Sequence, residues 1–291
     1  MVRIRIRTLL PPLASSAVTG VLAILRRPRV LASLALVTLF FAGAALGQWG
    51  GRRRQAAGRS GVPGWEVGRE HPEDVFTFAR LRYSSWRRPL DYETDWPDAD
   101  LNLSYRLQQL TSLKVHPEGK IIDITDESLR DYPFVYMVEP GGLELSDAEV
   151  AALRKYLLGG GFWMVDDFWG EKEWRNFYQQ VRRVFPDRDF VDLDISHPIF
   201  HTVFDLKEKP QMPSINVWEE TGLTYERYDA KEPQYRAIFD DKQRMMVFAC
   251  HNTDLGDGWE REGEDPRYFR LFSEKQAYPM AINVIFYAMT H

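Results

Sequence analysis

Short, nearly continuous apolar segments alternate along this chain with segments of helical periodicity, and that alternation constrains the fold more than any other feature. The segments predicted as strands are VFTFARLRY (75–83), KIIDI (120–124), FVYMV (134–138), FWMVD (162–166) and FVDLD (190–194). A late pair, YRAIF (235–239) and RMMVFAC (244–250), flanks a polar turn and predicts a β-hairpin. Continuously apolar strands are typical of parallel sheets covered on both faces. The pattern therefore predicts an α/β fold with an open, mostly parallel sheet, helices on both faces and a late hairpin.

Helical patterns occupy the segments between these strands. One helix is predicted over residues 100–114, and another follows Ser146, whose spacing to Glu149 spells a capping box. The glycines of 159–161 should end that second helix. A third helix should follow Asp167, and the last should span about 274–289.

The N-terminal residues predict export. Residues 1–63 contain ten Arg and no Lys, Asp or Glu, and the uncharged stretch 30–47 follows Arg26, Arg27 and Arg29. This apolar helix has a length between that of a signal-peptide core and that of a membrane span. We therefore predict that 1–48 is a basic leader, either a cleaved signal peptide or a retained membrane anchor. The body would then lie outside the cytoplasm, in the periplasm or attached to the cytoplasmic membrane.

The rest of the chain divides into a linker and a body. Residues 49–71 are rich in Arg and Gly without apolar periodicity, which predicts a flexible linker. Residues 72–291 have a length that suits one α/β domain. From Glu66 onward, 27 basic residues stand against 42 acidic ones. This acidic balance argues against nucleic acid as a partner, since nucleic-acid binding needs a basic face.

Polar side chains follow several predicted strands at the point where each strand ends. In open α/β sheets, ligands bind beyond the carboxyl ends of the strands. If the strands run parallel, these polar groups converge on one edge and form a crevice. The predicted crevice residues are Glu139, Asp166, Asp167, His251, Asn252 and Asp254.

Several of these residues also have a structural interpretation, which the sequence leaves open. Asp167 is placed to cap the helix predicted to begin near Glu171. Glu139 precedes a Pro-Gly-Gly turn, and His251 can be a hydrogen-bonded structural histidine. Among the tryptophans, Trp86, Trp96 and Trp259 lie in polar segments and are the candidates for ligand contact.

The sequence identifies no catalytic residue, metal site or cofactor. NTDLGDG (252–258) supplies oxygen ligands but does not fit the calcium-loop pattern, and no H-E-x-x-H or paired-cysteine pattern occurs. A divalent ion held by Asp166, Asp167, Asp254 and His251 is a conceivable alternative. Cys250, the only cysteine, ends an apolar strand, which predicts a buried thiol rather than a nucleophile.

Five blocks, in order, resemble a bacterial family known as domain of unknown function 4159. They are FTFARLRYSSWRR, YMVEPGGLELSDAEVAALRKYLLGGGFWMVDDFWGEKEW, VFPDRDFVDLDISHPIFH, HNTDLGDGWE and the terminal FYAMTH. The resemblance covers residues 76–291 and implies a protein that is exported or membrane-associated.

More distantly, LSDAEVAALRKYLLGGGFWMV, SHPIF and RMMVFACHN resemble the class I glutamine amidotransferase-like fold, especially its trehalose-utilisation-type branch. This resemblance implies a flavodoxin-like sheet and places Asp166 and Asp167 near the turn that carries the cysteine nucleophile in amidotransferases. No cysteine occupies that turn here, and the late His-x-Glu pattern is represented by His251 with Thr253. The resemblance therefore implies the fold without glutaminase chemistry.

Three hypotheses follow for function. The first is an exported or anchored domain that binds a ligand or an envelope protein partner without thiol catalysis. The second is an envelope hydrolase for a sugar-like or polar substrate, with Asp166 or Asp167 as base or metal ligand and His251 as acid/base partner. The third is a scaffold in an envelope complex, in which the aspartates have no role.

Overall fold

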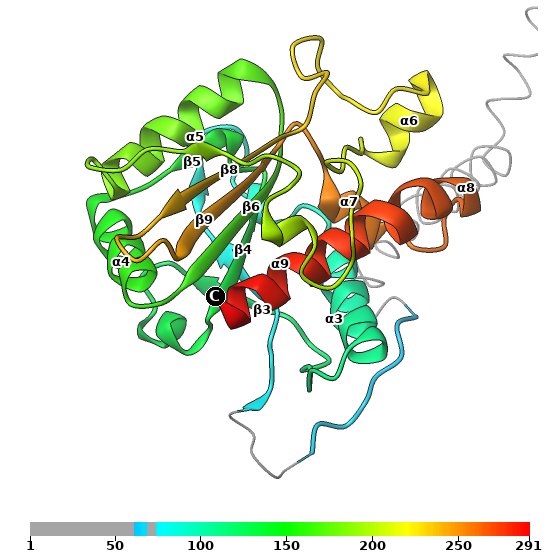
Figure 1. The fold of residues 1–291 in the computed structure, drawn as a ribbon, viewed down its shortest axis with the longest axis horizontal. Helices are drawn as coiled ribbons and strands as arrows, with labels where there is room; N and C mark the ends of the chain where they lie inside the picture. Colours follow the sequence, from blue (N-terminus) through cyan, green and yellow to red (C-terminus); the bar gives the residue numbers. More distant parts are fainter. Residues whose placement is uncertain (1–60, 69–73) are drawn as a thin grey trace, which may run out of the picture. The chain divides into compact units, whose positions relative to one another are not determined.

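The computed structural model describes residues 61–68 and 74–291, and a seven-stranded sheet forms its centre (Figure 1). In spatial order the strands are β3 (Lys120–Asp123), β1 (Ala79–Arg82), β4 (Phe134–Val138), β6 (Phe162–Phe168), β9 (Met245–His251), β8 (Gln234–Phe239) and β7 (Val191–Asp192). The strands β3, β1, β4, β6 and β9 run parallel, whereas β8 is antiparallel to both β9 and β7. The predicted mostly parallel sheet and late hairpin are confirmed. A separate two-stranded ladder pairs β2 (Ser84–Ser85) with β5 (Leu143–Glu144).

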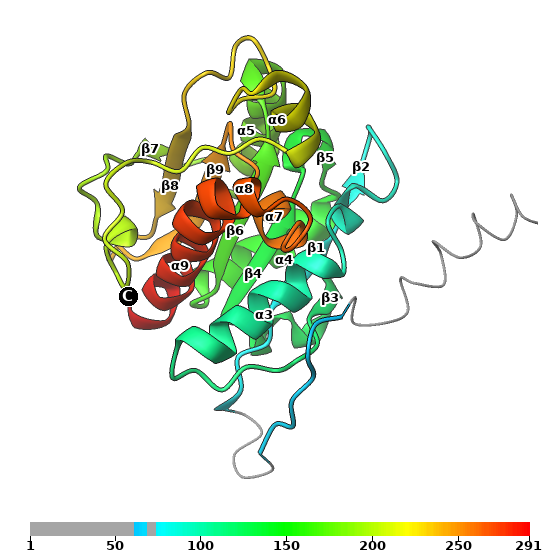
Figure 2. The ribbon, with the colours of Figure 1, turned by 90° about the vertical axis from the view of Figure 1, so that its right-hand side faces the viewer.

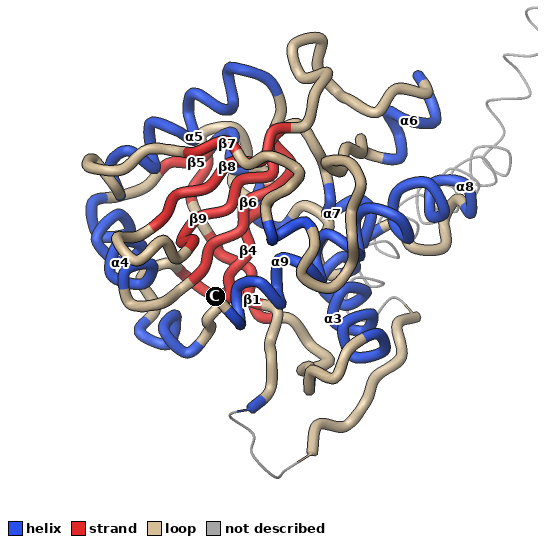
Figure 3. The backbone as a smooth tube through the Cα atoms, viewed as in Figure 1, coloured by secondary structure: helices blue, strands red, loops and turns tan. Residues whose placement is uncertain are grey.

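Helices cover both faces of the sheet, which Figures 2 and 3 show from two directions. One face is covered by α3 (Asp98–Leu110), α7 (Leu255–Glu260) and α9 (Tyr278–Thr290), whose apolar side chains share one core. The other face is covered by α4 (Asp147–Leu158) and α5 (Gly170–Val184), which share a second core. The remaining helical segments are η2 (Asp91–Glu93), η3 (Glu127–Asp131), η4 (Pro140–Gly142), η5 (Pro198–Phe200), α6 (Ile215–Thr221), α8 (Pro266–Tyr268) and the π-helix η6 (Phe269–Ala277).

The strand β6 shows why its sequence is continuously apolar. Its side chains alternate between the two faces, so that Phe162 and Met164 enter the α9 core while Trp163 and Val165 enter the α5 core. Because helices cover both faces, the strand has no solvent-facing side, and every residue of β6 is buried.

The capping box predicted at the start of α4 is confirmed. The Ser146 hydroxyl accepts a hydrogen bond from the Glu149 amide at 3.3 Å, and a Glu149 carboxylate oxygen accepts one from the Ser146 amide at 2.7 Å. The helix ends at Leu158, and Gly160 follows with a φ of 115°, a backbone conformation that favours glycine.

Several elements differ from their predicted bounds, and the first strand, the edge strand and the last helix show why. The first strand begins at Ala79 rather than at residue 75, because Phe76 forms only an isolated bridge with Val115. The predicted strand 190–194 shortens to the two exposed residues of β7, as is common for the edge of a sheet. The last helix is divided, since a π-helix precedes α9 and Pro279, which has no amide hydrogen, lies in the first turn of α9.

The predicted leader (1–48) and most of the predicted linker (49–71) lie outside the described residues, so the N-terminal apolar helix stays a prediction. Within the part of the chain that is described, no helix is both long enough and apolar enough to span a membrane.

Candidate functional site

Acidic side chains from several distant segments meet at the carboxyl edge of the sheet. They come from the loop before α3, from the end of β6, and from α7 and the residue that caps it. We call this group the acidic cluster, and its members are Asp95, Asp166, Asp167, Asp254, Asp257 and Glu260. Carboxylate oxygens of Asp95, Asp257 and Glu260 all lie within 4.8 Å of one another, close enough to hold one metal ion together.

A β-bulge at the end of β6 sets the direction of the two adjacent aspartates. Val165 pairs with Ala249 and Phe168 pairs with His251, so two residues of β6 lie opposite the single residue Cys250. Asp167, within the bulge, has a φ of 56°. Asp166 lies on the α7 side, as regular alternation from Met164 gives, whereas the extra residue returns Phe168 to the α5 side, because a bulge shifts the alternation of side chains.

Asp166 is fully buried and only partly satisfied. Its Oδ2 accepts hydrogen bonds from the Tyr136 hydroxyl at 3.3 Å and from the Gly256 amide at 3.0 Å. Its Oδ1 is buried without a hydrogen-bond partner among the described residues. Burial raises the pKa of Asp166 to about 7, since the ionised form loses its hydration.

Asp95 reaches the cluster because a buried arginine holds its loop. Arg80, in β1, is fully buried and donates hydrogen bonds to the carbonyls of Tyr92 and Thr94 at 3.2 and 2.7 Å. Its guanidinium also forms an ion pair with Asp100, at the start of α3. The loop between these anchors turns at Asp95, which has a φ of 63°.

Gly256 allows Asp95 to approach α7 closely. A Cβ atom at this position would lie 2.5 Å from Asp95 Oδ2 and 3.0 Å from the Tyr136 hydroxyl, so a side chain there would displace both groups. Asp95 Oδ2 is buried and has no hydrogen-bond partner among the described residues. The pKa of Asp95 is raised well above its usual range, by burial first and then by the charges of Glu260 and Asp257.

Asp254 and Asp257 organise the start of α7. Asp254 caps the helix by accepting a hydrogen bond from the Asp257 amide at 2.8 Å. Asp257 accepts hydrogen bonds from the Ile215 amide at 2.7 Å and from the Tyr268 hydroxyl at 3.1 Å. Burial raises the pKa of both carboxyl groups.

Charge compensation divides the acidic cluster into two parts. Asp257 and Glu260 form ion pairs with Arg261. By contrast, no Lys, Arg or His of the described residues forms an ion pair with any of the four others, Asp95, Asp166, Asp167 and Asp254. Buried carboxylates of proteins are normally paired, bound to a cation or protonated.

Asp167 does not cap the helix α5, which was one interpretation of its position. Its Oδ1 accepts a hydrogen bond from Trp169 Nε1 at 2.9 Å. The first amides of α5 are bonded by other side chains, since Asn252 accepts from Gly170 at 2.9 Å and Asp229 accepts from Glu171 at 3.0 Å. The capping interpretation of Asp167 is therefore wrong. Burial and the charge of Glu139 raise its pKa well above the usual range.

Glu139 lies at the same edge and is paired with two arginines, although its Oε2 accepts no hydrogen bond within the described part of the chain. Its Oε1 accepts hydrogen bonds from Arg88 and from the Thr94 hydroxyl, and its Oε2 lies 3.3 Å from an Arg87 nitrogen. Its backbone has a φ of 49°. Arg87 also pairs with Glu173, which pairs in turn with Arg227. We call this network of Arg87, Arg88, Arg227, Glu139 and Glu173 the arginine rim.

His251 lies on the other face of the sheet from Asp166. Its ring packs against Phe168 and Trp174, with centroids 4.9 and 5.3 Å away. Its Nε2 lies 3.1 Å from the Gly170 carbonyl and its Nδ1 lies 3.2 Å from Arg236. Burial lowers the pKa of His251 to about 4, so the imidazole is neutral at pH 7. The structure therefore brings Asp166, Asp167 and Asp254 together but leaves His251 among aromatic side chains.

The other predicted residues have structural contacts. The Asn252 side chain accepts from the Gly170 amide and donates to the Glu232 carbonyl at 3.0 Å, which joins the end of β9 to α5. Cys250 is buried as predicted, and burial raises its pKa. Trp259 is fully buried against Phe78 and Tyr136, so the prediction that it contacts ligand is wrong.

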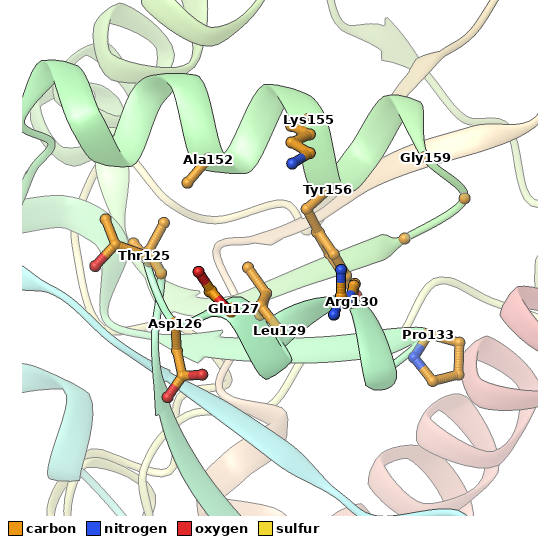
Figure 4. A pocket seen from close by; sticks show the side chains of 13 residues that line it. Thr125, Asp126, Glu127, Leu129, Arg130, Pro133, Ala152, Lys155, Tyr156 and Gly159 are labelled. Carbon is orange, nitrogen blue, oxygen red and sulfur yellow. The ribbon is translucent and has the colours of Figure 1, made fainter.

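A separate cavity of about 630 Å³ lies between η3 and the C-terminal end of α4 (Figure 4). Lys155 and Tyr156 of α4 and Arg130 of η3 are among its lining residues, together with the glycines after α4. None of the predicted crevice residues lines this cavity, so it is distinct from the acidic cluster.

Three members of the acidic cluster and one neighbour were not predicted from sequence: Asp95, Asp257, Glu260 and Tyr136. Asp257 and Glu260 lie in HNTDLGDGWE, the segment that supplied His251, Asn252 and Asp254. Their spacing of three residues within a helix was the available signal, because such residues share a helix face. Nothing in the sequence near Asp95 indicates its position, which depends on the distant Arg80.

The fold and this cluster define an α/β protein with a polar candidate site at the carboxyl edge of its sheet. Residues 77–289 match the family model described as "Domain of unknown function (DUF4159)", and the chain belongs to that family, as its sequence blocks predicted. A comparison with curated proteins gave no match. The function must therefore be argued from the site.

Proposed function

We propose that this chain is an exported or membrane-anchored binding module without thiol catalysis, and that its acidic cluster binds a divalent cation. The observation that carries the proposal is a set of four carboxyl groups that form no ion pair among the described residues, namely Asp95, Asp166, Asp167 and Asp254. A divalent cation would replace the protons that burial favours on these groups. The basic, apolar leader supports the location outside the cytoplasm.

The geometry around Asp95 supports a hard, oxygen-preferring ion. Asp95, Asp257 and Glu260 each offer a carboxylate oxygen within 4.8 Å of the other two, and cations such as Ca²⁺ and Mg²⁺ take oxygen ligands. Asp95 Oδ2 has no hydrogen bond within the described part of the chain that would compete with an ion. The left-handed backbone conformation of Asp95 costs free energy, and the hydrogen bonds that Arg80 donates to this loop hold the conformation in place.

The strand order supports the more specific fold that we propose, a flavodoxin-like sheet of the amidotransferase-like type. Numbered along the chain, the five parallel strands lie in the order second, first, third, fourth, fifth, which is the flavodoxin order. Such sheets bind ligands at the carboxyl ends beside the point where the order reverses, here between β1 and β4. Asp95 lies above this point, since Arg80 of β1 holds its loop.

Binding without thiol catalysis is supported by the residues at the end of β6. The bulge there carries Asp166 and Asp167, while the buried Cys250 lies opposite it on β9. The alternative, a hydrolase with an Asp–His pair, has less support. His251 makes no hydrogen bond to a member of the acidic cluster, and its lowered pKa disfavours proton donation near neutral pH.

Calorimetric titration of the metal-stripped full chain with Mg²⁺, Ca²⁺ and Mn²⁺ tests the proposal. We expect saturable binding of at least one ion, accompanied by release of protons. At a concentration one hundred times Kd, the ion should stabilise the fold by about 2.7 kcal/mol. Asp95→Asn with Asp257→Asn should abolish binding. Asp241→Asn, at an exposed position of the hairpin turn, is the matched control and should bind normally. Flat titrations with all three ions would overturn the proposal.

A further inference from the structure

We propose that a second site, a pocket beside the N-terminal end of α5, binds a saccharide. The pocket has a volume of about 430 Å³, and Trp86, Trp169, Tyr228 and Lys172 are among its lining residues. This volume falls within the range of small-molecule sites. We call it the aromatic pocket. It goes beyond the proposed cation site, because none of the unpaired carboxyl groups lines it.

The chain displays two large aromatic side chains at this pocket. Tyr228 is 87 % exposed, although its neighbours on both sides are anchored. Arg227 pairs with Glu173 at 3.2 Å, and Asp229 accepts the hydrogen bond from the Glu171 amide. The backbone is therefore fixed while the ring stays in solvent, so little conformational freedom is lost when a ligand covers it.

Trp86, which follows β2 and also lines the pocket, is held in a similar way. Its amide donates to the Gly142 carbonyl at 3.0 Å, and the next residue, Arg87, forms ion pairs with Glu139 and Glu173. The indole remains 49 % exposed, with Lys172 Nζ 5.2 Å from the ring centroid. Two exposed rings on anchored backbones offer flat apolar faces, the surface on which the C–H face of a pyranose ring stacks.

The charged groups of the aromatic pocket favour a neutral, hydroxyl-rich ligand over an ion. Glu173 is shared between Arg87 and Arg227, so the carboxylate and both guanidinium groups are already compensated. The remaining cation, Lys172, forms no ion pair among the described residues and lies over the Trp86 ring. Compensated groups retain donors and acceptors that can bond hydroxyl groups, because a guanidinium has five N–H donors and a carboxylate has several acceptor sites. An anion would have to compete with Glu173 for the same arginines. A sugar satisfies both kinds of group at once.

Tryptophan fluorescence of the full chain, titrated with cellotriose, maltotriose and chitotriose, tests this inference. We expect a saturable change with at least one of these sugars, since Trp86 and Trp169 line the pocket. Trp86→Ala and Tyr228→Ala should each weaken that binding about tenfold, the equivalent of about 1.4 kcal/mol of lost ring contact. Trp86→Phe should retain most of the affinity, because a flat ring remains.

Controls separate this site from the acidic cluster and from loss of folding. Leu110→Ala removes an exposed apolar side chain at the end of α3 and should leave sugar binding unchanged. Asp95→Asn with Asp257→Asn should also bind sugar normally, so failure of the cation proposal leaves this test intact. Absence of any saturable change, or equal binding by Trp86→Ala, Tyr228→Ala and the parent chain, would overturn the inference.

Discussion

Two groups of carboxylates lie at the same edge of the sheet and differ in how their charge is compensated. In the arginine rim, Glu139 is paired with Arg87 and Arg88, and Glu173 with Arg87 and Arg227. In the acidic cluster, four of six carboxyl groups have no cationic partner among the described residues. Both groups occupy strand ends, loops and the helices that follow β6 and β9, at the edge where ligand sites of open α/β sheets are found.

The difference teaches that position at a strand end does not by itself identify a binding group. Glu139 was predicted at this edge for the same reason as Asp166, yet its charge is already satisfied by the protein. A buried carboxyl group without a partner lowers stability when it ionises, and a bound cation removes that cost. The uncompensated charge therefore separates a candidate site from a structural network.

Removing a compensated charge should have the largest effect. Asp100 pairs with Arg80, and both side chains are almost completely buried. Asp100→Asn leaves the arginine charge unpaired, so we expect the free energy of unfolding to fall by about 3 to 5 kcal/mol. Urea unfolding followed by circular dichroism measures this change.

The exposed pair between Arg82 and Asp123 is the matched control for this prediction. Asp123→Asn should cost less than about 1 kcal/mol, because exposed ion pairs contribute little. Similar losses for the two variants would show that burial does not control the strength of these pairs, which contradicts the prediction for Asp100.

Removing an uncompensated charge should raise the free energy of unfolding, by an amount somewhat smaller than the loss expected for Asp100→Asn. The pKa of Asp166 is about 7 in the folded chain, above the usual value of a carboxyl group in an unfolded one. Between these two values the folded state binds more protons, so stability falls as pH rises from about 4 to about 7. In metal-free buffer at pH 8, Asp166→Asn should therefore stabilise the fold by about 2 to 4 kcal/mol.

The pH dependence distinguishes this charge effect from a change in packing. At pH 4, Asp166 is protonated in the folded state and about half protonated in the unfolded state, so Asp166→Asn should be close to neutral. Unfolding midpoints at pH 4 and pH 8 give both values. A loss of stability at both pH values would mean that the ionised carboxylate is itself structural, which contradicts an uncompensated group awaiting a cation.

Much of the scaffold was predictable because strands and helices depend on local patterns. The apolar runs of 134–138 and 162–166 gave buried strands, and the Ser146–Glu149 spacing gave the observed capping box. Convergence of Asp166 and Asp254 followed from parallel strands alone. These features depend on residues that are close together in the sequence or on the direction of the strands, and a sequence pattern predicts both.

The details of the site were less predictable because they depend on contacts between distant residues. Asp95 enters the cluster through Arg80, fifteen positions earlier in the chain, and through the space left by Gly256. The bulge at Asp166 and Asp167 has no pattern that separates it from a regular strand. The sequence did contain a signal for the position of His251. Every second residue of a strand lies on the same face, so His251 shares the face of β9 that carries Val247 and Ala249.

Asp254 offers the smallest and most discriminating test, because it is both a helix cap and an uncompensated charge. Asparagine caps helices about as well as aspartate, whereas alanine cannot accept the hydrogen bond from the Asp257 amide. At pH 4, Asp254→Ala should therefore lose about 1 kcal/mol and Asp254→Asn should be nearly neutral. At pH 8 in metal-free buffer, Asp254→Asn should be more stable than the parent chain, because burial and the charge of Asp167 raise the pKa of Asp254. If Asp254→Asn and Asp254→Ala lower the free energy of unfolding by the same amount at both pH values, Asp254 acts neither as a helix cap nor as an uncompensated charge. It would then not be grouped with Asp166.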